Sequence, residues 1–240
     1  MKIIAFNGSP RGSEGNTYIM VESFLKGAKA AGAEVEQVLL SEKNIKHCQG
    51  CFSCWLKTPG QCVIKDDMSE LLEKYVAADI IVIATPLYVF NVTGIMKDFM
   101  DRTIPLGDPH FEASKGGICR HVFENNITKK YVIISNCGFP EQEHFEVLHN
   151  LFNKTWKYQV GEVLAEIYRG QGAILTNPPF LLKPIINGYK SLLEEAGSQI
   201  VKNSKLSEDL ITKLNKPLIP IDLYIKEANK GFDKILSKAG

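Results

Sequence analysis

The 240-residue chain contains no long hydrophobic run and no excess of charge of either sign. Its longest uninterrupted apolar run, residues 80–84, is far shorter than the roughly 20 residues that a membrane-spanning helix needs. Lys and Arg number 28 against 27 Asp and Glu, a formal net charge of +1, which argues against a polyanion binder and against an acidic electron shuttle. We therefore expect a soluble protein with neither a nucleic-acid partner nor a membrane partner.

The N-terminus lacks the pattern of a secretory signal. Residues 3–6 are followed at once by the turn-forming sequence Asn-Gly-Ser-Pro-Arg, and not by a longer apolar region with a cleavage site. The six cysteines are therefore expected in a reducing cytoplasm, where clustered thiols indicate metal or redox chemistry more often than disulfides. We expect a cytoplasmic protein.

Short apolar runs alternate with helical patterns over about the first 170 residues. Strands are expected at residues 2–6, 34–40, 80–84, 130–135 and 163–168, with helical patterns between them. This alternation predicts an α/β fold with a doubly wound parallel sheet, whose ligands bind at the carboxyl ends of the strands. We expect a domain over residues 1–170 and a helical C-terminal extension, residues 171–240, packed on it or on a partner subunit.

The loop after the first strand carries an unusual set of donors. It lacks the Gly-Lys-Ser/Thr ending of a nucleoside-triphosphate loop, and its glycines miss the spacing of dinucleotide folds. It offers instead the hydroxyls of Ser9, Ser13 and Thr17, the cation of Arg11 and the N–H groups of a helix start. This combination suits a terminal monophosphate, although a plain turn whose hydroxyls cap the helix is the alternative.

Two further loops are expected at the same edge of the sheet, residues 85–92 after the third strand and residues 136–141 after the fourth. The first of them contains Tyr88 and Phe90, which in isolation would be ordinary core residues. At a strand's carboxyl end beside a phosphate loop, they favour a site for a flat heteroaromatic ring.

Three motifs together resemble the NADPH-dependent FMN reductases of the flavodoxin-like superfamily. They are Gly-Ser-Pro-Arg at residues 8–11, Thr-Pro-Leu-Tyr at residues 85–88, and the stretch at residues 94–102. The cysteine spacing that begins at Cys48 narrows the resemblance to the iron-sulfur flavoproteins within that group. The resemblance covers about residues 1–140 and implies a flavodoxin-like five-stranded sheet of order 2-1-3-4-5.

The resemblance also implies which residues contact FMN. The phosphate would be held by Ser9, Arg11, Ser13, Asn16 and Thr17. The isoalloxazine would be bordered by Pro86, Leu87, Tyr88, Val89, Phe90, Asn91, Asn136, Cys137 and Gly138. NADPH or NADH would be the reductant, and a homodimer or homotetramer is expected, in which a partner subunit helps to cover the flavin.

Four cysteines lie close together in the sequence. Cys48, Cys51 and Cys54 are separated by two residues each, and Cys62 follows after seven more. This spacing fits a [4Fe-4S] cluster, because a tight loop lets three sulfurs converge while the fourth arrives from a nearby turn. Two alternatives stay open: structural or redox-active free thiols, and a zinc site.

The sequence therefore predicts an FMN-dependent NAD(P)H oxidoreductase that passes electrons to a quinone, a flavin or a similar small acceptor. Because the flavin carries the chemistry, no catalytic side chain is expected. One alternative is an iron-sulfur flavoprotein that exchanges electrons with redox proteins through FMN and a [4Fe-4S] cluster. Another is a regulatory protein that kept the fold and lost the flavin.

Overall fold

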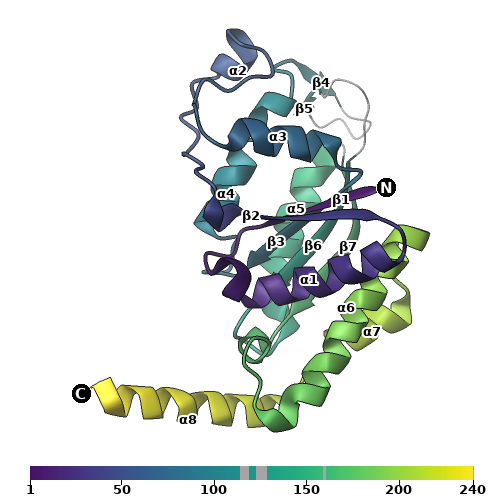
Figure 1. Ribbon diagram of the computed structural model, residues 1–240. Coiled ribbons are helices and arrows are strands. Elements are labelled where there is room, and N and C mark those ends of the chain that lie inside the picture. The colour runs from purple at the N-terminus through teal and green to yellow at the C-terminus, as the bar shows by residue number, and fades with distance from the viewer. Residues whose placement is uncertain (114–118, 123–128, 159–160, 240) are drawn as a thin grey trace.

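A five-stranded parallel sheet forms the centre of the protein (Figure 1). The computed structural model describes residues 1–113, 119–122, 129–158 and 161–239. The strands are β1 (Lys2–Asn7), β2 (Glu34–Leu39), β3 (Ile80–Pro86), β6 (Lys129–Asn136) and β7 (Gly161–Arg169). Their order is β2-β1-β3-β6-β7, so the predicted order 2-1-3-4-5 and the doubly wound topology are confirmed.

Helices cover both faces of the sheet (Figure 1). One face packs against α1 (Asn16–Ala30), α6 (Lys183–Asn203) and α7 (Glu208–Asn215). The other packs against α3 (Met68–Ala77), α4 (Gly94–Asp101) and α5 (Glu146–Tyr158). Because each central strand is buried on both faces, its side chains are apolar almost without interruption, as in β3.

Three elements lie outside these two layers. The short helix α2 (Ser53–Leu56) belongs to the cysteine loop, and α8 (Ile221–Ala239) ends the described chain. The short strands β4 (Phe111–Ala113) and β5 (Cys119–His121) form an antiparallel pair, which the sequence patterns did not predict. Among the described residues, no helix is long and apolar enough to cross a membrane.

The extension contributes directly to the core. Helix α6 lies beside α1, and its apolar face belongs to the same buried cluster as β1, β3 and β6. The division into residues 1–170 and 171–240 stays a prediction, but α6 and α7 cover the sheet as closely as the helices that precede them.

Two glycines let α1 and α6 approach each other at backbone distance. A Cβ added at Gly27 would lie 1.7 Å from the carbonyl oxygen of Glu194, and one added at Gly197 would lie 1.9 Å from the carbonyl oxygen of Phe24. Real Cβ atoms do not approach so closely, so any side chain here would force the helices apart.

We predict that Gly197→Ala lowers the free energy of unfolding by about 3 kcal/mol or more, because the added methyl group overpacks the contact between α1 and α6. The matched control is Gly188→Ala in the same helix, where an added Cβ meets nothing within 4 Å. The control should gain about 0.5–1 kcal/mol, since alanine is the better helix former. Urea unfolding of the two variants measures both effects, and equal effects would contradict the close approach.

Candidate functional site

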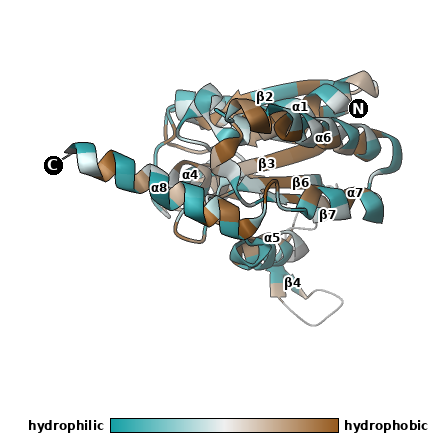
Figure 2. Ribbon diagram, turned by 90° about the horizontal axis from the view of Figure 1, so that it is seen from below, coloured by the Kyte–Doolittle hydropathy of each residue, from teal (hydrophilic) through white to brown (hydrophobic). Residues whose placement is uncertain are grey.

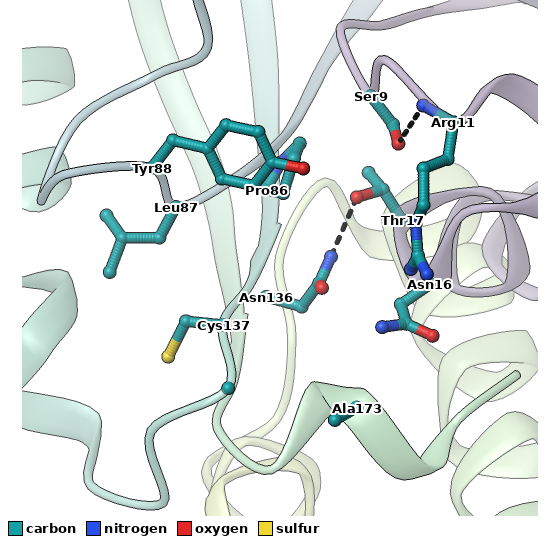
Figure 3. Close-up of a pocket in the computed structure, with 11 residues that line it drawn as sticks. Ser9, Arg11, Asn16, Thr17, Pro86, Leu87, Tyr88, Asn136, Cys137 and Ala173 are labelled. Atoms are coloured by element: carbon teal, nitrogen blue, oxygen red, sulfur yellow. Dashed lines mark hydrogen bonds between the residues drawn. The ribbon is translucent and has the colours of Figure 1, made fainter. Parts of the chain in front are cut away.

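Three loops meet at the carboxyl edge of the sheet. In the strand register, Asn7 of β1 pairs with Ala84 of β3, and Pro86 at the end of β3 pairs with Asn136 of β6. The three loops therefore leave the sheet side by side and enclose a pocket of about 140 Å³ (Figure 3). Its lining residues are Ser9, Arg11, Asn16, Thr17, Pro86, Leu87, Tyr88, Asn136, Cys137, Gly138 and Ala173.

One end of the pocket is formed by the first loop and the start of α1. None of the described side chains caps α1, so no side chain competes for the backbone N–H groups of its first turn. The hydroxyl oxygen of Thr17 accepts a hydrogen bond from the Asn136 amide at 2.7 Å, which leaves the Thr17 proton free to donate. The alternative in which hydroxyls of this loop merely cap the helix therefore receives no support.

Arg11 brings positive charge to the same end. Its backbone N–H donates to the hydroxyl of Ser9 at 3.3 Å, and its side chain is exposed and extends toward Asn16 (Figure 3). Ser9 and Thr17 are only 2% and 1% exposed, so their hydroxyls are held in fixed positions. A helix start, two ordered hydroxyls and one cation are the groups that a phosphate-sized anion would require.

The other end of the pocket is less polar. Pro86, Leu87 and Tyr88 come from the second loop, and Cys137 and Gly138 come from the third. The N–H of Leu87 donates to the carbonyl of Asn136 at 2.9 Å, which joins the two loops. Burial raises the pKa of the Cys137 thiol to about 11, so this sulfur is neutral at physiological pH.

Four of the predicted FMN contacts lie outside the pocket lining. Ser13 is exposed in the short helical turn after Arg11. Val89, Phe90 and Asn91 belong to a tight hairpin, in which Val89 and Phe90 adopt left-handed backbone angles, φ +47° and +57°. In this rare backbone conformation Val89 is 94% exposed, and the Phe90 ring stacks on Phe139 of the third loop, with ring centroids 6.2 Å apart.

Ala173 lines the pocket although the sequence analysis did not include it. It belongs to a short helical turn, Gly172–Ile174, that follows β7. A Cβ at Gly172 would lie 3.0 Å from the side-chain oxygen of Asn136, so glycine lets this turn pack against the third loop. The Gly-Gln-Gly sequence at residues 170–172 was the available signal for a close approach.

The four clustered cysteines line a second, smaller cavity, of about 20 Å³. Cys48 and Cys51 are exposed, Cys54 is buried and Cys62 is half-buried. Burial raises the pKa of Cys54, whereas hydrogen bonds from Ser53 lower that of Cys51. Within the described residues, no group of three or more His, Cys, Asp or Glu is arranged to hold a single metal ion.

A buried ion pair supports this cysteine loop. Arg102 lines the cysteine cavity and binds Asp66 through two nitrogens, at 2.6 and 2.9 Å, while both side chains are at most 1% exposed. Asp66 also accepts the backbone N–H groups of Lys46 and Met68. Burial alone would raise the pKa of Asp66, but Arg102 and the two N–H groups lower it below its ordinary value.

A doubly wound sheet with a polar pocket at its carboxyl edge defines a flavodoxin-like nucleotide-binding fold. The chain belongs to the NADPH-dependent FMN reductase family, which it matches over residues 1–153. The resemblance drawn from the sequence motifs is therefore confirmed.

Curated relatives extend the comparison. An iron-sulfur flavoprotein of Archaeoglobus fulgidus is 42% identical over 143 residues, which cover 59% of this chain and 58% of that protein. An iron-sulfur flavoprotein of Methanocaldococcus jannaschii is 41% identical over 106 residues, 44% of this chain and 53% of that protein. The chain thus spans somewhat more than half the length of these two relatives.

Among solved structures, an FMN-dependent NADH-azoreductase from Bacillus anthracis, in complex with FMN, superposes with a TM-score of 0.61 at 19% sequence identity. The superposition covers 83% of this chain and 99% of the azoreductase. At this identity the similarity demonstrates a shared fold.

We predict that the Asp66–Arg102 pair makes stability depend on pH. Because the pKa of Asp66 is lowered in the folded state, its contribution is complete above its ordinary pKa and is lost as the pH falls through the lowered value. Asp66→Asn leaves Arg102 buried without a counter-ion and should cost about 3–5 kcal/mol near neutral pH. The wild type should also lose stability below about pH 4 more steeply than the variant.

The control is Asp101→Asn. Asp101 is 47% exposed and pairs with Lys97 one helical turn away, so its loss should cost about 0.5 kcal/mol at most. Urea unfolding between neutral and acidic pH tests both variants. Parallel pH profiles for the wild type and Asp66→Asn would contradict the prediction.

Proposed function

We propose that this protein binds FMN in the pocket at the carboxyl edge of the sheet and uses it to transfer electrons from NADPH or NADH to a small acceptor. The observation that carries the proposal is the pocket itself, to which three separate loops bring an anion site at one end and a less polar wall at the other. Membership of the FMN reductase family supports it.

The polar end of the pocket fits the FMN phosphate. Ser9 and Thr17 would donate hydroxyl protons to phosphate oxygens, Arg11 would supply the counter-charge, and the uncapped N–H groups of α1 would add the positive end of the helix dipole. Asn136 acts here as a positioning residue, because its amide fixes which way the Thr17 hydroxyl points.

The less polar end fits the ring. Pro86, Leu87 and Tyr88 offer a wall of apolar and aromatic atoms, and Gly138 lines the same end without adding a side chain. The neutral Cys137 thiol places no charge beside the ring. Ser13, Val89, Phe90 and Asn91 lie outside this lining, so contacts from them to FMN stay a prediction.

Bound FMN would supply the redox chemistry, which is hydride acceptance from a nicotinamide and release of electrons singly or in pairs. The protein residues bind and orient the ring and exclude water from its inner face. Tyr88 is 47% exposed, so the pocket stays open to solvent on that side, where a nicotinamide and then an acceptor could approach. We infer a small acceptor such as a quinone or a free flavin.

A second function is favoured by the cysteine cavity: electron transfer through FMN together with a [4Fe-4S] cluster. Four thiols around one cavity are the donor set of such a cluster, and the two curated relatives are called iron-sulfur flavoproteins.

We predict that Arg11→Glu weakens FMN binding at least about tenfold, because it replaces a charge-assisted hydrogen bond to the phosphate with repulsion. Riboflavin lacks the phosphate, so its affinity should change little. Quenching of flavin fluorescence on titration measures both dissociation constants. Lys29→Glu, the same charge change on an exposed residue near the opposite end of α1, is the control.

Equal FMN affinity in Arg11→Glu and Lys29→Glu would refute the phosphate site. The FMN-loaded wild type should also be bleached rapidly by NADPH or NADH in a stopped-flow instrument and turn over with a quinone. If nicotinamides fail to reduce it while a ferredoxin exchanges electrons with it, the protein is an electron carrier. If FMN neither binds nor raises Tm, it is a protein that has lost the flavin.

We predict that protein purified without oxygen contains about four iron and four sulfide ions per chain if the cysteine cavity holds a cluster. Cys62→Ser should then lose most of the iron, whereas Cys119→Ser should retain it, because Cys119 lies in β5 and does not line the cavity. Chemical analysis of iron and sulfide provides the measurement. A yellow wild-type protein without iron would leave the cysteines as free thiols.

A further inference from the structure

Within the part of the chain that the structure describes, helix α8 is buried against the rest of the protein near its first turn. Figures 1 and 2 both show it extending away from the sheet and the other helices, with its C-terminal end the farthest point. Tyr224, 8% exposed, is its one residue in the buried core among those described. The Tyr224 hydroxyl donates to the carbonyl of Gly138 at 2.6 Å, which fixes the first turn of α8 beside the third loop of the pocket.

The projecting part of α8 carries large apolar side chains in the open. Ile225 is 42% exposed, Phe232 62%, Ile235 65% and Leu236 69%. Single exposed apolar residues are common on protein surfaces, but several on one face of one projecting helix indicate an interaction surface. Within the described chain, no other element covers them.

The spacing of the apolar residues is that of a coiled coil. The stripe consists of residues 221, 225, 228, 232 and 235, separated by four, three, four and three positions. These are the a and d positions of a heptad repeat. The charged residues of the helix lie beside or opposite the stripe, so that its centre is apolar.

The charges select the direction in which two such helices pair. Residues 221–229 contain two acids and one lysine, a net charge of −1, whereas residues 230–239 contain three lysines and one aspartate, a net charge of +2. A parallel pair would place the two positive halves together. An antiparallel pair places each positive half against a negative half and also opposes the two helix dipoles.

We propose that the apolar stripe of α8 is a docking surface for α8 of a second copy of this chain, in an antiparallel pair. With Lys230 at the centre, Ile225 of each copy faces Ile235 of the other, and the small Ala228 faces the large Phe232. The same stripe serves both copies, as a twofold-symmetric interface requires. The pairing does not depend on the proposed flavin chemistry.

The first test is the molar mass of the full-length protein, measured by light scattering after gel filtration over a range of concentrations. The wild type should be an even-numbered oligomer, and Phe232→Glu should have half its mass at concentrations where the wild type is fully associated. Ser237→Glu adds the same charge at an exposed position off the stripe and should keep the wild-type mass. Because Phe232 is exposed in the single chain, its substitution should leave Tm at the lowest concentrations unchanged.

The second test is the direction of the pair. A photocrosslinking amino acid in place of Leu236 should attach to the first turn of α8 in the other copy. In a parallel pair it would attach near residue 236 instead, about 20 Å away along the helix.

Besides a crosslink near residue 236, three outcomes would overturn the proposal. One is a monomeric wild type, including one that sediments with anionic lipid vesicles, since the stripe would then serve a membrane surface. The others are identical masses for the wild type and Phe232→Glu, and crosslinks confined to a single chain.

Discussion

One residue, Asn136, joins the three loops on which the pocket depends. Its side-chain amide donates to Thr17, 119 residues earlier in the chain, and its carbonyl accepts from Leu87 in the second loop. The side chain is 4% exposed, so neither bond competes strongly with water. The strand register brings the loops to one edge, and the bonds of Asn136 join them there, as does the bond from the Thr93 hydroxyl to the Gly8 carbonyl at 2.7 Å. The anion site, the ring wall and the turn at Gly172 are all built around Asn136.

The sequence predicted the sheet well because its signal is local. Residues 80–84 are apolar at every position, as a strand covered on both faces must be, and turn-forming residues follow the first strand at once. The carboxyl ends of parallel strands share one edge of the sheet. The strand pattern therefore predicted that the loops of Ser9 and Cys137 meet at that edge, and both residues line the pocket there. The motifs then identified the family.

The features that the sequence did not predict are formed by contacts that leave no pattern in neighbouring residues. Tight hairpins with two left-handed residues are normally recognised by Asn-Gly or similar pairs, so the sequence at Val89 and Phe90 did not indicate a hairpin. The strands β4 and β5 have three residues each, too few to show the alternation of a strand, and all three residues of β4 are exposed. Ala173 enters the pocket only because Gly172 packs against Asn136. The role of α6 in covering the sheet likewise rests on Gly27 and Gly197.

The protonated state of Cys137 affects how easily this thiol is oxidised. Reactive oxygen species attack thiolates that solvent can reach, and a flavin reoxidised by air is a local source of peroxide. Cys137 lines the proposed flavin pocket but is 7% exposed and neutral, so it resists sulfenic acid formation where oxidant would be most concentrated. Cys51 is exposed, and hydrogen bonds from Ser53 lower its pKa, so ageing in air would modify this thiol first.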